Sequence, residues 1–256
     1  MNHVNIIDVN SKNINDMGVY CIKNIISSGS QAKMSWCRLS NNRYLKLKIA
    51  VDSNKKQLGF IEYTPAESAW RPVEAEGYLF IHCIGIFGKK ARGKNIGLSL
   101  IKECEKDARS LNKAGVCVMT SKGPWIANKR IFEKNGYKKA DELDRFELMV
   151  KKFNTESPSP RLINWKEQQK QYIGWNLIYS DQCPWHDKSV SDLKETATEY
   201  GINLKIKKIK NSSEAKRAPS GFGVYSLIKD GRLLDDHYLS KTRFKNILTR
   251  ELKIRQ

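Results

Sequence analysis

Apolar and polar positions fall into blocks along the chain, and the clearest block spans residues 78–111. An apolar run of strand length, YLFIHCIGIF, comes first, and a basic loop with glycines, GKKARGKNIG, follows it. The next residues place apolar side chains at helical spacing, namely Leu98, Ile101, Cys104, Ala108 and Leu111. The pattern predicts a strand, a loop and a helix in this order.

The rest of the first 153 residues reads as further strands with helices between them. Apolar runs predict strands at 4–9, 44–51, 57–63, 115–120, 137–140 and 145–152. Helical stretches are expected at 17–26 and 32–39, with a break at the serine-rich residues 27–30. A further helix is expected at about 125–135, where Asn135-Gly136 forms a typical helix stop.

A linker and a second domain follow. Residues 154–172 carry two prolines, serines and charges without a strong apolar period. Beyond them the pattern predicts strands and helices in the order strand 174–179, helix 187–200, strands 203–209, 223–229 and 232–235, and helix 240–250. We therefore expect a domain at 1–153, a linker at 154–172 and a smaller α/β domain at 173–256.

Composition limits the class of protein. The chain has 256 residues, 40% of them hydrophobic, which suffices for packed cores. It has neither an apolar run near the roughly 18–20 residues that span a bilayer nor a recognisable secretory signal at its start. Six scattered cysteines indicate reduced thiols rather than a disulfide framework, so we expect a cytoplasmic protein that does not bind a membrane.

The formal net charge of +19 is spread over both halves. It has two interpretations, a basic surface without a specific role or an anionic partner such as a nucleotide cofactor, an acidic substrate or RNA. We favour the first, and a nucleic-acid partner stays a secondary hypothesis.

The basic loop has the layout of a phosphate-binding site. A helix N-terminus presents free N–H groups and the positive end of its dipole, and glycines let the backbone come close to an anion. Residues 92–97, RGKNIG, occupy that place, with Arg92 and Lys94 as cations beside the backbone.

This block, with VCVMTS (116–121) and WIANKRIFEKNGYKKAD (125–141), resembles the acetyl-CoA core of the GNAT N-acetyltransferases. Arg92 and Gly97 match the first and last positions of their pyrophosphate loop, and Asn95 stands at the middle glycine. The resemblance implies an α+β protein with a mixed, splayed sheet flanked by helices, and acetyl-CoA as acyl donor. The implied cofactor-binding residues are Ile84, Gly85, Ile86, Phe87, Arg92, Gly93, Lys94, Asn95, Ile96, Gly97, Asn128 and Phe132.

The second domain resembles a thioredoxin fold, with Cys183-Pro-Trp-His in place of its Cys-x-x-Cys motif. Together with AESAWRPVEAEGY, YSDQCPW and APSGFGVYSL, the two halves look like the YoaP-type GNAT proteins. Because a second cysteine is missing, a dithiol oxidoreductase is not expected. Cys183 follows a strand and precedes a helix, so it is either a reactive thiol or an inherited fold position.

Acetyl transfer to an amine needs a base, and two residues are candidates. His82 has a suitable unperturbed pKa of about 6.5, and strand alternation puts Glu76 on the same face as His82. Phe132 stands where many relatives carry the tyrosine that protonates the leaving thiolate. Tyr137 and Ser121 lie nearby in the pattern, and we interpret both as structural. We expect no metal site.

These observations predict an acetyl-CoA-dependent N-acetyltransferase that acetylates a primary amine of a small molecule or peptide by direct transfer. The alternatives are a non-catalytic acyl-CoA-binding regulator, for which Phe132 argues, and an RNA- or ribosome-associated protein, which only the charge suggests. The sequence leaves the acceptor and the oligomeric state open.

Overall fold

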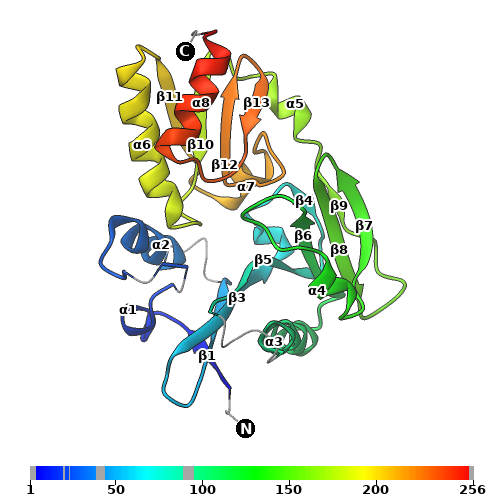
Figure 1. Ribbon diagram of the computed structural model, residues 1–256. Coiled ribbons are helices and arrows are strands. Elements are labelled where there is room, and N and C mark those ends of the chain that lie inside the picture. The colour runs from blue at the N-terminus through cyan, green and yellow to red at the C-terminus, as the bar shows by residue number, and fades with distance from the viewer. Residues whose placement is uncertain (1–3, 20, 23, 39–43, 89–94, 254–256) are drawn as a thin grey trace. The chain divides into compact units, whose positions relative to one another are not determined.

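The computed structural model describes residues 4–19, 21–22, 24–38, 44–88 and 95–253 (Figure 1). The chain forms two compact units. Unit 1 contains residues 1–25, 37–69 and 73–163, and unit 2 contains residues 26–36, 70–72 and 164–256. Among the described residues, no helix is long and apolar enough to cross a membrane.

Unit 1 is built on a seven-stranded mixed sheet in the order β1-β2-β3-β5-β6-β8-β7. All neighbouring strands are antiparallel except β5 and β6, which are parallel. The strands are β1 (Asn5–Val9), β2 (Lys46–Val51), β3 (Gln57–Pro65), β5 (Tyr78–Ile86), β6 (Gly115–Ser121), β7 (Lys138–Leu143) and β8 (Phe146–Lys152). This is the mixed α+β arrangement that the sequence predicts.

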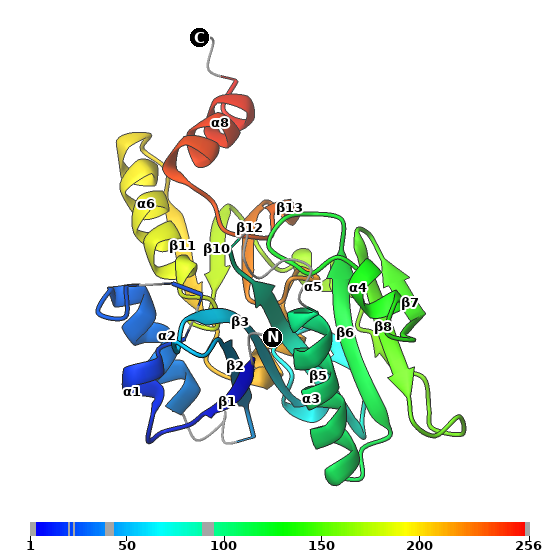
Figure 2. The same cartoon turned by 60° about the horizontal axis from the view of Figure 1, so that its bottom comes forward.

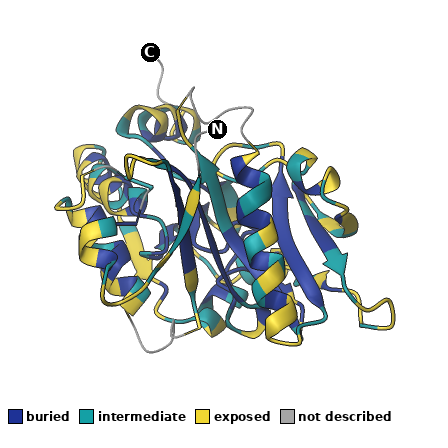
Figure 3. Cartoon of the chain, turned by 90° about the horizontal axis from the view of Figure 1, so that it is seen from below, coloured by how far each residue is buried: buried dark blue, intermediate teal, exposed yellow. Residues whose placement is uncertain are grey.

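Helix α3 (Ile96–Ser110) covers one face of this sheet (Figure 2). Its buried stripe includes Leu100, Ile101, Cys104 and Ala108, which pack with the apolar side chains of β3, β5 and β6. Its other side is exposed, as the alternation of buried and exposed turns in Figure 3 shows. The predicted period of apolar residues therefore marks the core-facing side of α3.

A β-bulge in β5 changes which residues face this core. The register with β3 shifts between Glu62 and Tyr63, so that His82 is the extra residue of β5. Leu79 and Ile81 before the bulge, and Ile84 and Ile86 after it, all pack on the α3 side. Simple alternation along β5, which the sequence analysis assumed, therefore fails at His82.

Two predicted helices are wrong in extent. The expected helix 17–26 is only α1 (Ile14–Met17), and the expected break at 27–30 is the start of α2 (Ser28–Arg38). Ser27 Oγ accepts a bond from the Ser30 N–H at 3.3 Å and so caps α2. A side-chain carbon at Gly29 would lie 2.1 Å from the Pro184 carbonyl oxygen, so this helical position requires glycine.

The helix expected at 125–135 is only α4 (Arg130–Glu133). A bond from the Ser121 N–H to the Ala127 carbonyl closes the preceding segment as a loop, and Trp125 there has a left-handed φ of 66°. The predicted stop is confirmed, because Gly136 has a φ of 82° and its N–H bonds to the Glu133 carbonyl.

Unit 2 has a four-stranded sheet in the order β11-β10-β12-β13. Its strands are β10 (Trp175–Tyr179), β11 (Leu204–Lys208), β12 (Tyr225–Lys229) and β13 (Arg232–Asp235). Only β10 and β11 are parallel. The helices are α5 (Lys166–Gln169), α6 (Trp185–Glu199), α7 (Ser212–Lys216) and α8 (Lys241–Glu251). The order is compatible with a thioredoxin-like domain, and that assignment stays a prediction.

Segments from the first half of the sequence complete unit 2. Ser28 Oγ donates to Asp187 Oδ2 at 2.6 Å, and the rings of Trp36 and Trp70 meet edge-to-face at 5.1 Å. The guanidinium of Arg71 lies 5.0 Å from the centre of the Phe222 ring. Sequence order alone therefore does not determine the composition of this unit.

The predicted linker carries short elements of its own. In unit 1, β9 (Arg161–Leu162) pairs with β4 (Val73–Glu74), and the Tyr78 hydroxyl donates to the Pro158 carbonyl at 2.8 Å. Helix α5, which belongs to unit 2, begins a few residues later. The predicted boundaries of the two domains stay a prediction.

Candidate active site

Strands β5 and β6 pair along only part of their length. Their parallel ladder joins Tyr78 to Gly115 and ends at Ile81 with Val118. Beyond Ile81, the described residues of β5 pair with β3 alone. Buried residues give way to half-buried ones from Cys83 to Ile86. The sheet is therefore splayed here, as expected, and one edge of β5 is open to a ligand that bonds like an added strand.

The N-terminus of α3 lies beside this opening. A side-chain carbon at Gly97 would lie 2.6 Å from Ile131 and 3.8 Å from Ile86, so the start of α3, α4 and the parted end of β5 meet at Gly97. Asn95, the residue before α3, has a left-handed φ of 55°. It thus adopts the conformation that the middle glycine of the loop would supply. Arg92, Gly93 and Lys94 lie outside the described residues.

Gly85 permits an aromatic contact at the end of β5. A side-chain carbon there would lie 2.6 Å from the Phe60 ring and 3.0 Å from the Phe87 ring. These two rings stack with centroids 6.0 Å apart and planes at 9°. Gly85 itself pairs regularly with Phe60, and the β-bulge of this strand lies three residues earlier, at His82.

Asn128 and Phe132, the two predicted cofactor residues near α4, differ in exposure. Asn128 is exposed, and its side-chain oxygen accepts a bond from the Arg130 N–H at 3.0 Å. Phe132 is fully buried in the unit 1 core, edge-to-face against Tyr137 at 5.4 Å. Phe132 therefore acts as a core residue of the described structure, whereas Asn128 is accessible to a ligand.

The two predicted bases lie far apart. His82 is the bulge residue, just past the end of the β5–β6 ladder, and its Nδ1 lies 3.2 Å from Glu62 Oε1. Both side chains are buried, with exposed fractions of 0% and 1%. Glu76 is exposed on the turn before β5. The strand from Tyr78 to His82 alone spans about 13 Å, so the structure does not bring the pair together.

Tyr137 and Ser121, the two hydroxyl residues that lie near Phe132 in the sequence pattern, lie in structural surroundings. Tyr137 is buried in the core, and burial raises the pKa of its hydroxyl well above the usual value. Ser121 Oγ accepts bonds from the Gly123 N–H at 3.0 Å and from Arg145 at 2.9 Å. These surroundings give neither Tyr137 nor Ser121 a role in proton transfer.

In unit 2, Cys183 is half-buried and lies two residues before α6. His186 stands where the second cysteine of a Cys-x-x-Cys motif would be. Its Nδ1 lies 2.8 Å from the Ser180 carbonyl oxygen, which only accepts, so Nδ1 carries the proton. Burial lowers the pKa of His186 to about 3, so its ring is neutral at physiological pH. The reactivity of Cys183 stays a prediction.

Three consecutive residues of unit 2, Asp235, Asp236 and His237, bring potential metal ligands within 4.8 Å of one another. Arg243 lies 3.0 Å from His237 Nε2 and 2.8 Å from Asp235 Oδ2. Because arginine only donates, Nε2 accepts and the proton of the neutral ring is on Nδ1, next to Asp235. This arrangement is typical of a buried ion-pair network and leaves Nδ1 no lone pair for a metal.

Comparison with known sequences agrees with this architecture. The family model described as YoaP-like matches residues 203–246, which lie in unit 2. A Bacillus subtilis protein named "Uncharacterized N-acetyltransferase YoaP" is 29% identical over 195 residues, covering 74% of this chain and 76% of its own. The resemblance to YoaP-type GNAT proteins that the sequence motifs indicated is thus confirmed.

Solved GNAT structures resemble the chain more distantly. An acetyltransferase of the GNAT family from Staphylococcus aureus gives a TM-score of 0.45 at 13% identity, covering 59% of this chain and 100% of its own. A GNAT family N-acetyltransferase from Escherichia coli in complex with CoA gives a TM-score of 0.45 at 11% identity, covering 63% and 91%.

Sequence reasoning missed the partner of His82. Nothing in the order of residues shows that the carboxylate of Glu62 meets the imidazole of His82. The signal is the register of β3 against β5, which places Glu62 opposite Cys83 and next to the bulge.

Proposed function

We propose that the protein is an acyl-CoA-dependent N-acetyltransferase that transfers an acetyl group from acetyl-CoA directly to a primary amine. The observation that supports this most strongly is the opening between β5 and β6, with the N-terminus of α3 beside it. The name of the Bacillus subtilis relative points to the same activity. The acceptor is a small molecule or peptide.

The donor would be held by backbone groups more than by side chains. The free N–H groups at the start of α3, from Asn95 to Gly97, bind the pyrophosphate. The open edge of β5 from Ile84 to Phe87 bonds to the pantetheine arm, and Asn128 contacts that arm from the other side. Arg92 and Lys94 add positive charge to this set.

In the transfer, the amine nitrogen forms a bond to the acetyl carbon and the carbon–sulfur bond breaks. An ammonium group cannot attack, so a base must first remove its proton. His82 is our proposed base, acting through a water molecule because its ring is buried, with Glu62 stabilising the imidazolium that forms. CoA leaves as a thiolate that takes a proton from water, since Phe132 has none to give.

Release of CoA thiol from acetyl-CoA, measured with a panel of primary amines, tests the activity. We expect amine-dependent release with a KM for acetyl-CoA between about 1 µM and 1 mM. Saturable CoA binding without turnover for any amine would support the alternative of an acyl-CoA-binding regulator. Absence of CoA binding would contradict both.

The base is tested by comparing His82→Gln, Glu62→Gln and Glu76→Gln over a range of pH. We expect His82→Gln to lower kcat by about 100-fold or more. We also expect this variant to lose the acid limb of the pH–rate profile, where the rate of the original protein falls at low pH. An acid limb that is unchanged in His82→Gln but lost in Glu76→Gln would reverse the assignment. Urea midpoints of the variants separate lost chemistry from lost folding.

A further inference from the structure

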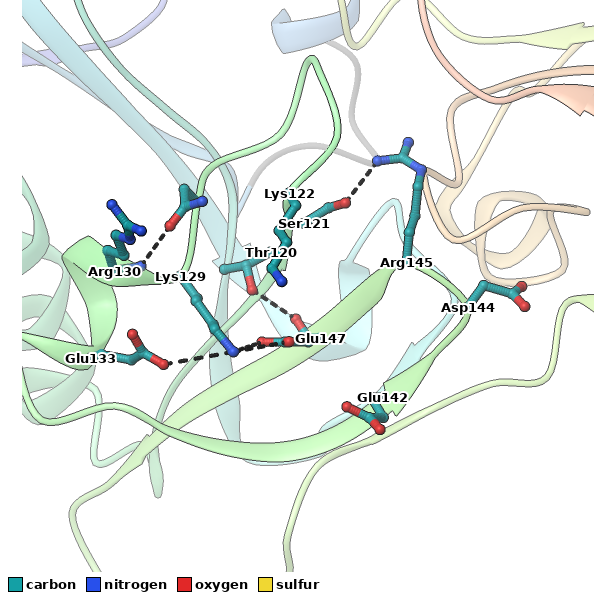
Figure 4. Close-up of a pocket in the computed structure, with 11 residues that line it drawn as sticks. Thr120, Ser121, Lys122, Lys129, Arg130, Glu133, Glu142, Asp144, Arg145 and Glu147 are labelled. Carbon is teal, nitrogen blue, oxygen red and sulfur yellow. Dashed lines mark hydrogen bonds and ion pairs between the residues drawn. The ribbon is translucent and has the colours of Figure 1, made fainter.

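A cavity of about 460 Å³ lies in unit 1 between the end of β6, α4 and the β7–β8 turn (Figure 4). Its volume is within the range of small-molecule sites. None of its eleven lining residues is apolar. Four are basic and four are acidic, and the others are Thr120, Ser121 and Asn128. A ligand that fits this lining is polar, because an apolar one would leave these groups desolvated and unpaired.

Two of the four cations are already engaged. Lys129 Nζ lies 2.9 Å from Glu147 and 3.8 Å from Glu133, and the hydrogen bond to Glu147 raises the pKa of Lys129. Arg145 donates to Ser121 at 2.9 Å. Figure 4 shows these three interactions as dashed lines. These contacts hold the wall of the cavity together.

The other two cations have no such partner. In the part of the chain that the structure describes, neither the Lys122 ammonium nor the Arg130 guanidinium makes an ion pair or a hydrogen bond. The bond at Arg130 in Figure 4 comes from its backbone N–H, which donates to Asn128. Both line the cavity, so their charges are available to an anionic group of a ligand.

The cavity also offers an acceptor to a hydrogen-bond donor. Glu147 Oε2 is buried and accepts no well-aligned hydrogen bond, although Lys129 lies close to it. An N–H group of a ligand can donate a hydrogen bond to this oxygen. The free cations of the cavity suit an anionic group, and the oxygen of Glu147 suits an N–H donor. A ligand that matches both carries an amine and an anionic group.

The position of the cavity links it to the proposed reaction. Thr120 and Ser121 belong to the stretch of β6 beyond Val118, where β5 no longer pairs with β6. Asn128, a proposed contact of the pantetheine arm, also lines it. The cavity therefore adjoins the opening that we assign to the acyl donor.

We propose that this cavity holds the acceptor, a small primary amine that also carries a carboxylate or phosphate group, with Lys122 and Arg130 binding the anionic group. The proposal rests on the proposed function and narrows its substrate class. A polyamine has no anionic group to pair with Lys122 and Arg130, and an apolar amine would find no apolar residue in the lining.

Matched pairs of amines test the proposal, for example glutamate with glutamine amide, glycine with glycinamide, and phosphoethanolamine with ethanolamine. We expect kcat/KM to be at least tenfold higher for the anionic member of a pair. The carboxylate and phosphate pairs show which anion is used. Equal or higher kcat/KM for the members that lack the anionic group would overturn the proposal.

Variants separate this site from the donor site. Lys122→Gln and Arg130→Gln should each raise the KM for the anionic acceptor about tenfold, and leave the KM for acetyl-CoA within twofold. Lys134→Gln, an exposed α4 neighbour that does not line the cavity, is the matched control and should change neither value. Unchanged acceptor KM in both cavity variants would contradict the assignment.

Calorimetry with the same anionic amines covers the case in which no amine is acetylated. If an anionic amine binds the original protein and this binding is lost in the Lys122→Gln, Arg130→Gln double variant, the proposed site is supported although the proposed function fails. No binding of any probe up to 10 mM would overturn the site itself.

Discussion

The two parallel strand pairs of the molecule, β5–β6 in unit 1 and β10–β11 in unit 2, differ in how they end. Each pair joins a strand, a helix and the next strand. The β10–β11 ladder runs from Trp175 to the last residue of β10, Tyr179, and a further bond from the Ile209 N–H to the Tyr179 carbonyl continues it. The β5–β6 ladder stops at Ile81, with five residues of β5 still to come.

The turns that lead into the helices differ in the same way. After β10, the Ser180 carbonyl is bonded by His186, the Ser180 N–H bonds to the Val224 carbonyl, and Ser180 Oγ accepts the Gln182 N–H. After β5 the strand edge is open, and the start of α3 lies beside it. The same strand–helix succession thus gives a closed turn in unit 2 and a candidate ligand site in unit 1.

The largest effect is expected from a charge at the open end. Gly97→Asp places a carboxylate at the start of α3, where a phosphate would bind, so CoA affinity should fall at least 100-fold. Gly97→Ala adds bulk against Ile131 without charge and should cost less than tenfold. Calorimetry with CoA measures both. Equal losses of CoA affinity in the two variants would show that side-chain bulk at position 97, and not its charge, weakens binding.

The closed turn after β10 in unit 2 should make the free energy of unfolding depend on pH. The folded-state pKa of His186 is about 3, below its unfolded value of about 6.5, so the unfolded chain binds more protons between these values. Stability should therefore fall as the pH drops below about 6.5, by about 2 kcal/mol for this group between pH 7 and pH 5.

Urea unfolding of the full chain at both pH values measures this effect, and His186→Gln is the comparison. We expect His186→Gln to be less stable than the original chain at pH 7. Between pH 7 and pH 5, however, the free energy of unfolding should decrease less in the variant than in the original chain. A pH dependence identical to that of the original chain would show that His186 does not titrate as its burial requires.

A smaller effect is expected from the left-handed residue before α3. Asn95→Ala should lower stability by about 1–2 kcal/mol, because a Cβ disfavours this conformation and alanine lacks the amide of asparagine. Asn95→Gly should be tolerated without strain and should bind CoA at least as well. Equal stability of the alanine and glycine variants, measured by urea unfolding, would contradict a strained Asn95.

Local periodicity predicted most of the elements, and contacts between distant segments explain the failures. The apolar period of α3 and the strand runs depend on neighbours in sequence, so their positions agree with the structure to within a few residues. The start of α2 at the serine cluster depends on Gly29 meeting Pro184, and no local pattern shows that contact.

The candidate site divides in the same way. The glycine loop, the opening beyond Ile81 and the left-handed Asn95 follow from motif and residue type. Glu62 beside His82 and the cavity around Lys122 depend on strand register and on the short α4, which the sequence extended into a longer helix. Such features need the tertiary structure.

Amide hydrogen exchange along β5, with and without CoA, tests the central claim most directly. If the donor occupies the opening, CoA should slow exchange between His82 and Phe87 and leave residues 78–81, already paired on both sides, unchanged. Unaltered exchange at 82–87 in the presence of saturating CoA would contradict the account.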